Sequence, residues 1–132
     1  MPSRSVQKGI TASALCFAGL GLLLLFAAEE LAELLDPGAG SHALLPLLGA
    51  AMLGFGAMNW IARGSALGGI YGRAIVAGNQ THLTIGAIAL VKRLFDTTST
   101  HPLPWVLAGL YVLGAVYFSY LTFFSSGIEK RA

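Results

Sequence analysis

The sequence has few charged residues and a single cysteine, and both shortages limit what the chain can be. Charged residues make up 11% of the 132 residues, against about 25% in soluble domains. An internal disulfide is excluded because Cys16 is the sole cysteine, and its place inside an apolar run indicates a small apolar side chain in a helix. The net charge of +2 is small and scattered, which argues against nucleic-acid binding.

Motifs of known chemistry are also missing. The sequence has no nucleophile elbow, Walker loop or dinucleotide fingerprint. We expect no metal site, because no His-x-x-His, Cys-x-x-Cys or Glu-x-x-His spacing is present. We expect no haem, because His42 and His101 fall in loops, away from the depth of His82. We therefore assign no catalytic residue and no cofactor, and the sequence leans away from an enzyme.

The chain does contain long apolar runs. The mean hydropathy is +0.72, and the apolar residues lie in blocks, so the solvent for this fold is lipid. Each block is close to the roughly 20 residues that an α-helix needs to cross the hydrocarbon core. The sequence predicts one all-α transmembrane domain over residues 1–132, with four spans at approximately 10–28, 44–61, 73–91 and 105–124.

The first span begins after two basic residues, as a signal peptide would. A cleavage site needs small residues at two positions, but Phe26 stands two residues before Ala28. We therefore expect an uncleaved helix. It should continue through the acidic segment 29–35 until Asp36-Pro37-Gly38 ends it.

Short loops join the predicted spans, at residues 62–69 and 96–104. Short loops favour antiparallel neighbours, so the sequence predicts an up-down four-helix bundle. Each span also carries small residues four apart, which let helix backbones approach closely in lipid. These pairs are Ala14 and Ala18, Ala50 and Gly54, Ala74 and Gly78, and Ala115 and Ser119.

Basic residues are divided unevenly between the two sides of the predicted membrane. Six of the eight fall on one side and only Lys92 and Arg93 on the other. The positive-inside rule places the six in the cytoplasm, and both termini with them. The six are Arg4, Lys8, Arg63, Arg73, Lys130 and Arg131.

The third span has a polar middle, at the depth where polar groups cost most. Asn79 and His82 share one helix face at i, i+3, and lipid cannot satisfy either side chain. One interpretation is an interhelical hydrogen bond; the other is a ligand site or proton relay built around the imidazole. Possible partners are Asn59, Tyr111, Tyr117, Ser119 and Thr122. None of the six carboxylates lies at that depth, so we expect His82 to act through hydrogen bonding more than charge.

A second polar group is predicted at the cytoplasmic ends of the second and third spans. It consists of Asn59, Arg63 and Arg73. Arginine suits a phosphate or lipid head group. The alternative is that these arginines anchor the two helices at the interface.

The stretch from Gly54 to Leu90 resembles small, uncharacterised four-span bacterial inner-membrane proteins. The residues that carry the resemblance are Asn59-Trp60, Arg63, Gly72-Arg73, Gly78-Asn79 and His82. The resemblance implies a bacterial inner membrane and a four-helix bundle, and it implies no activity.

Three hypotheses of function remain open. The first is a non-enzymatic scaffold or accessory subunit, in a homo-oligomer or with a larger membrane partner. The second is an oligomeric transporter or channel for ions or small solutes, with a polar path at Asn79 and His82. The third is a binder or enzyme for a quinone- or isoprenoid-type lipid, with a pocket lined by the aromatic fourth span.

Overall fold

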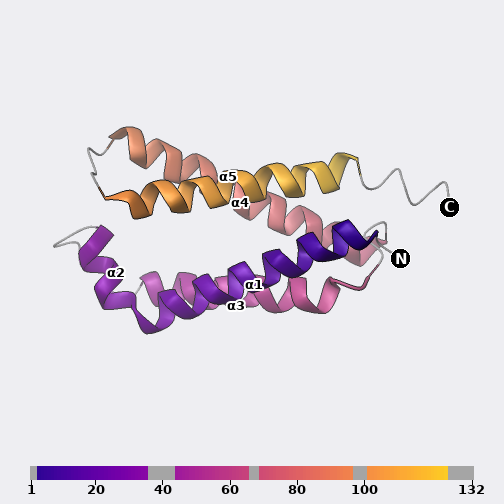
Figure 1. Ribbon diagram of the computed structural model, residues 1–132, viewed down its shortest axis with the longest axis horizontal. Coiled ribbons are helices and arrows are strands. Elements are labelled where there is room, and N and C mark those ends of the chain that lie inside the picture. Colours follow the sequence, from indigo (N-terminus) through magenta and orange to yellow (C-terminus); the bar gives the residue numbers. More distant parts are fainter. Residues whose placement is uncertain (1–2, 36–43, 66–68, 97–100, 125–132) are drawn as a thin grey trace. The chain divides into compact units, whose positions relative to one another are not determined.

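The computed structural model describes residues 3–35, 44–65, 69–96 and 101–124, and these residues form helices without any strand. The described helices are α1 (Arg4–Phe26), α2 (Ala28–Leu35), α3 (Leu44–Ala62), α4 (Ile70–Asp96) and α5 (Pro102–Phe123) (Figure 1). All but α2 are long and apolar enough to cross a membrane. The prediction of an all-α multi-pass membrane protein is therefore confirmed, and the four long helices are compatible with a membrane helical bundle.

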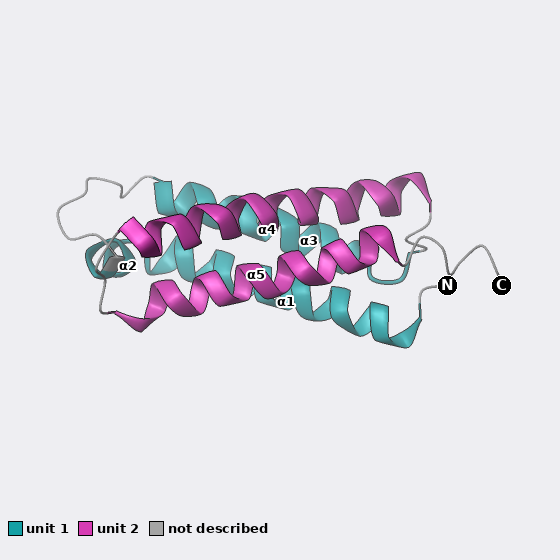
Figure 2. Cartoon of the chain, turned by 90° about the horizontal axis from the view of Figure 1, so that it is seen from above, with its two compact units in different colours: residues 1–65 teal, residues 66–132 magenta. Residues whose placement is uncertain are grey.

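The chain divides into two compact units, residues 1–65 and 66–132 (Figure 2). The first unit holds α1, α2 and α3, and the second holds α4 and α5. In each unit the two long helices run antiparallel and side by side (Figures 1 and 2). Two of the predicted neighbour pairs, the first span with the second and the third with the fourth, are thus present.

Glycine lets the backbones of α1 and α3 meet. A Cβ atom added to Gly21 would lie 2.8 Å from the Gly49 carbonyl oxygen, and one added to Gly49 would lie 2.8 Å from the Gly21 carbonyl oxygen. A Cβ atom on Gly56 would lie 3.0 Å from the Ala18 backbone nitrogen. The two helices are therefore closer along this line than any other residue would allow.

In the α4–α5 pair the glycines instead leave space that large side chains of the other helix fill. A Cβ atom on Gly86 would lie 2.6 Å from Cδ1 of Tyr111, and one on Gly114 would lie 3.0 Å from Cδ1 of Leu83. Tyr111 and Leu83 are both buried. In this pair, large side chains pack against glycines of the opposite helix, whereas α1 and α3 are in contact through their backbones.

The first span ends earlier than the sequence predicts. Its helix stops at Phe26, and Ala27 adopts φ −116° and ψ 33° before α2 begins. Figure 1 shows α2 turning away from the axis of α1. Alanines 28 and 32 are buried while glutamates 29, 30 and 33 are exposed, the two-faced pattern typical of a helix at the membrane interface. If α1 continued straight, the apolar face of residues 28–35 would extend into water. The turn at Ala27 lets α2 keep that face out of water. The predicted stop at 36–38 lies outside the described residues.

The loop predicted at residues 96–104 is also too long. Helix α5 begins at Pro102, with His101 as its N-cap; the His101 Nδ1 atom accepts a hydrogen bond from the Leu103 backbone N–H at 3.2 Å. Proline is compatible with the first turn of a helix because its missing N–H has no partner there. Pro102 and Pro104 therefore start the helix, where the prediction used them to extend the loop.

The four small-residue pairs differ in whether they contact a neighbouring helix. Ala14 and Ala18 meet Gly56 of α3, and Ser119 hydrogen-bonds to α4. Gly54 and Gly78 are different: a Cβ atom on either would meet no heavy atom within 4 Å. The spacing alone thus identified helix faces suited to close packing, without showing which of them the neighbouring helix uses.

Candidate functional site

The polar centre of α4 lies midway between its charged ends. Arg73 and Lys92 are both exposed, and the helix between them is about 28 Å long, close to the ~30 Å thickness of the hydrocarbon core. His82 is near the midpoint of that distance. At this depth no water is available, so the imidazole needs a hydrogen-bond partner within the protein.

His82 is paired with α5. Its Nε2 atom lies 3.3 Å from the Tyr111 hydroxyl, and the two ring centroids are 5.6 Å apart with planes tilted by 51°. Tyr111 is only 6% exposed. Gly86, one turn beyond His82, makes the space for the tyrosine ring. Tyr111 was among the possible partners named from the sequence, and the interhelical bond predicted for His82 is present.

Gln80 makes a second polar link between α4 and α5. The Thr122 hydroxyl donates to the Gln80 carboxamide oxygen at 2.6 Å, and the Gln80 amide donates to the Ser119 hydroxyl at 3.3 Å. The Thr122 hydroxyl also lies 2.9 Å from the Phe118 carbonyl oxygen, so its single proton is shared between two acceptors. The carboxamide is thus held through both of its polar ends.

Gln80 was not among the site residues chosen from the sequence. A signal for it existed: Ser119 and Thr122 are three residues apart on α5 and so share a face. A long carboxamide on the adjacent antiparallel helix suits two such hydroxyls. The choice of Asn79 and His82 rested on their common face, and Gln80 falls outside that face.

Asn79 is wholly buried, with 0% of its surface exposed. Its side-chain amide donates to the Ile75 carbonyl oxygen at 2.8 Å, one turn earlier in the same helix. His82 reaches across to α5, whereas this Asn79 bond stays within α4.

Asn59 and Tyr117, the other predicted polar candidates, belong to different units. Asn59 lies on α3 in the first unit and is 0% exposed. Tyr117 lies on α5, partly buried, with its ring edge-on to Phe118 at a centroid distance of 5.4 Å.

Arg63 and Arg73 were candidates for a cytoplasmic anion site, with anchoring at the interface as the alternative. The Arg63 guanidinium instead lies over the Trp60 indole, 3.7 Å from the ring centroid, and its Nη1 donates to the Trp60 carbonyl oxygen. This cation–π contact fits the alternative of an interfacial anchor, because tryptophan and arginine both favour the headgroup level. Arg73 is exposed near the start of α4, in the second unit.

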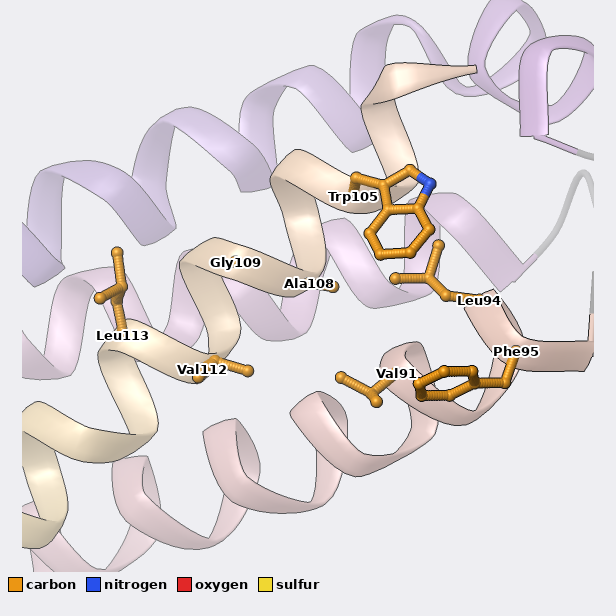
Figure 3. Close-up of a pocket in the computed structure, with 8 residues that line it drawn as sticks. All are labelled: Val91, Leu94, Phe95, Trp105, Ala108, Gly109, Val112 and Leu113. Atoms are coloured by element: carbon orange, nitrogen blue, oxygen red, sulfur yellow. The ribbon is translucent and has the colours of Figure 1, made fainter. Parts of the chain in front are cut away.

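An apolar groove opens where α4 ends and α5 begins (Figure 3). Its volume is about 410 Å³. Figure 3 shows the Trp105 indole beside Leu94 and the Phe95 ring beside Val91, so both helices supply walls. We call it the α4–α5 groove; its lining residues are Val91, Leu94, Phe95, Trp105, Ala108, Gly109, Val112 and Leu113.

The chemistry available in the described residues is hydrogen bonding and apolar contact. They contain no cluster of three histidine, cysteine, aspartate or glutamate side chains placed to hold a metal ion. Every buried side-chain nitrogen and oxygen among them has a hydrogen-bond partner. His42, considered as a metal or haem ligand, lies outside the described residues. Comparison with protein-family models, with curated proteins and with solved structures finds no match.

Proposed function

We propose that this chain is a non-enzymatic scaffold or accessory subunit of the bacterial inner membrane. Both termini lie in the cytoplasm, and the chain acts in a homo-oligomer or with a larger membrane partner. The orientation is supported by the uneven division of basic residues. A reporter at the C-terminus that is active only in the periplasm would contradict it.

The observation that carries the proposal is the state of the polar side chains in the spans. His82 is bonded to Tyr111, and Gln80 to Ser119 and Thr122. No buried polar side-chain atom of the described residues is left without a partner. Catalytic and transport sites aim polar groups at a substrate, whereas these groups are engaged in joining one helix to another.

The glycines without close neighbours supply the surface for a partner. Gly54 with Ala50, and Gly78 with Ala74, form small-residue faces on α3 and α4. A Cβ atom on either glycine would meet nothing within 4 Å. In lipid, helices associate through such small faces because backbones can approach closely. The faces are therefore suited to a helix from another subunit.

The test replaces these glycines by a bulky residue. We expect Gly54→Leu and Gly78→Leu to reduce cross-linked oligomers, or cross-links to a partner, in native membranes. Gly19→Leu is the matched control, because Gly19 also has open space around it but is flanked at i±4 by the exposed Leu15 and Leu23. The proposal fails if the three variants cross-link like the unmodified protein, or if all three lose cross-links equally.

A further inference from the structure

The α4–α5 groove is open, apolar and placed at one end of the membrane-spanning part of the pair. Its volume of about 410 Å³ falls within the roughly 300–1,000 Å³ of pockets that bind small molecules. Trp105 is 57% exposed at its edge, and indoles favour the membrane–water interface. The groove therefore runs from the interface into the hydrocarbon region, where the available apolar molecules are lipid chains.

A cation lies next to the groove lining in the chain. Lys92 follows the lining residue Val91 and shares a face with Phe95 at i, i+3. It is exposed, and a lysine near a helix end extends its ammonium group to the headgroup level. An apolar slot with a positive charge at its interfacial end matches a lipid with an apolar chain and a negative head.

At this end of the α4–α5 pair, two basic residues stand against the single acidic residue Asp96, while the predicted topology places Glu29, Glu30 and Glu33 on the same side of the membrane. Arg93 is exposed, and at about 3.6 residues per turn it falls on the side of α4 away from Val91 and Phe95. Asp96 is exposed one turn beyond Lys92. The N-terminus of α5, capped by His101, adds the positive end of a helix dipole. Lys92 and Arg93 are also the basic residues that depart from the positive-inside distribution. A contact with a lipid phosphate would explain why Lys92 lies on the side of the membrane that has few basic residues.

We propose that the α4–α5 groove holds an acyl chain of an anionic phospholipid, whose phosphate is bound by the Lys92 ammonium. Lys92 selects the charge, and the apolar walls hold the chain. The site is independent of the faces at Gly54 and Gly78, so it does not rest on the scaffold proposal.

The charge part of the proposal is tested by native mass spectrometry of the detergent-purified protein. The probes are phosphatidylglycerol and phosphatidylcholine with identical acyl chains, added separately at equal concentration. The unmodified protein should retain more phosphatidylglycerol. Lys92→Gln should weaken phosphatidylglycerol binding by about fivefold, the effect of one interfacial cation, and leave phosphatidylcholine binding unchanged. Arg93→Gln removes the same charge from the opposite side and should keep the preference.

The groove part is tested by filling it. A Cβ atom at Gly109 meets nothing within 4 Å, so Gly109→Leu places its side chain in the groove without a clash at the Cβ. It should lower binding of both lipids, whereas Gly19→Leu should not. Circular dichroism establishes that each variant is helical and folded before lipids are added.

Three results would overturn the proposal. The first is equal retention of the two lipids by the unmodified protein. The second is a phosphatidylglycerol preference that Lys92→Gln leaves intact or that Arg93→Gln abolishes. The third is lipid binding unchanged in Gly109→Leu while an oligomer dissociates, which would make the groove a protein interface.

Discussion

At the scale of single residues, the hydrogen bond between His82 and Tyr111 is the feature that gives a polar group at mid-membrane a partner. The bond joins α4 to α5 at 3.3 Å, and Gly86 provides the room for the tyrosine ring. Hydrogen bonds between transmembrane helices contribute about 0.6 kcal/mol on average and up to about 1.7 kcal/mol. The contribution of this pair is therefore modest and measurable.

His82→Leu should lower the free energy of unfolding by roughly 1 kcal/mol, because the hydrogen bond to the Tyr111 hydroxyl is then lost. His82→Gln retains donor and acceptor groups and should cost less. Tyr111→Phe removes the other partner, so combining it with His82→Leu should cost less than the two separate effects together. Unfolding in mixed detergent micelles, followed by circular dichroism, measures all four variants against the unmodified protein. Independent, fully additive effects would show that the bond does not stabilise the pair.

The sequence alone predicted some of the residues of this site. The depth of His82 and the candidate partner Tyr111 could be read from the sequence, because polar groups in an apolar span need an acceptor or donor. The role of Gln80 could not, since which of several polar residues faces α5 depends on the rotation of the helix. For Arg63 the sequence left two interpretations open, because it does not say whether a guanidinium stacks on a neighbouring tryptophan or extends to a phosphate.

At the scale of helices, the two pairs are held by different contacts. Helices α1 and α3 meet backbone to backbone at Gly21 and Gly49, whereas α4 and α5 interlock side chains with glycine gaps at Gly86 and Gly114. A backbone cannot move aside as a side chain can. The α1–α3 pair should therefore tolerate added volume least.

Gly49→Ala should separate α1 from α3, because its new methyl group would lie 2.8 Å from the Gly21 carbonyl oxygen. We expect a loss of about 1–3 kcal/mol in the free energy of unfolding, the usual cost of overpacking. Gly54→Ala, on the same helix with open space, is the control and should be neutral or slightly stabilising, since alanine favours helix. Unfolding in mixed micelles compares the two. Equal stability of both variants would refute the close backbone contact.

Helix existence was predictable here and helix ends were not. Long apolar runs predict four helices, because a single segment in lipid satisfies all of its backbone hydrogen bonds internally only as a helix. The break at Ala27 was missed, since no proline or glycine marks it and the turn follows from the two-faced character of α2. The start of α5 was missed because Pro102 reads as a loop residue unless its place in a first turn is considered.

At the scale of the whole molecule, four candidate spans carry their polar side chains in paired form and leave two small-residue faces without close neighbours. These faces are centred on Gly54 and Gly78. A scaffold or accessory subunit needs such faces, because lipid supplies no hydrophobic drive between helices and close packing must replace it. A transporter with a path at Asn79 and His82 would instead need those side chains to reach a solute.

Native mass spectrometry of the protein extracted from its membrane in a mild detergent tests this central proposal most directly. It reports the number of copies and any partner subunit in one spectrum. We predict a mass above that of one 13.7 kDa chain, from further copies or from a second membrane protein that remains bound. A spectrum of single chains, with no partner recovered in detergents that preserve known membrane complexes, would contradict the proposal.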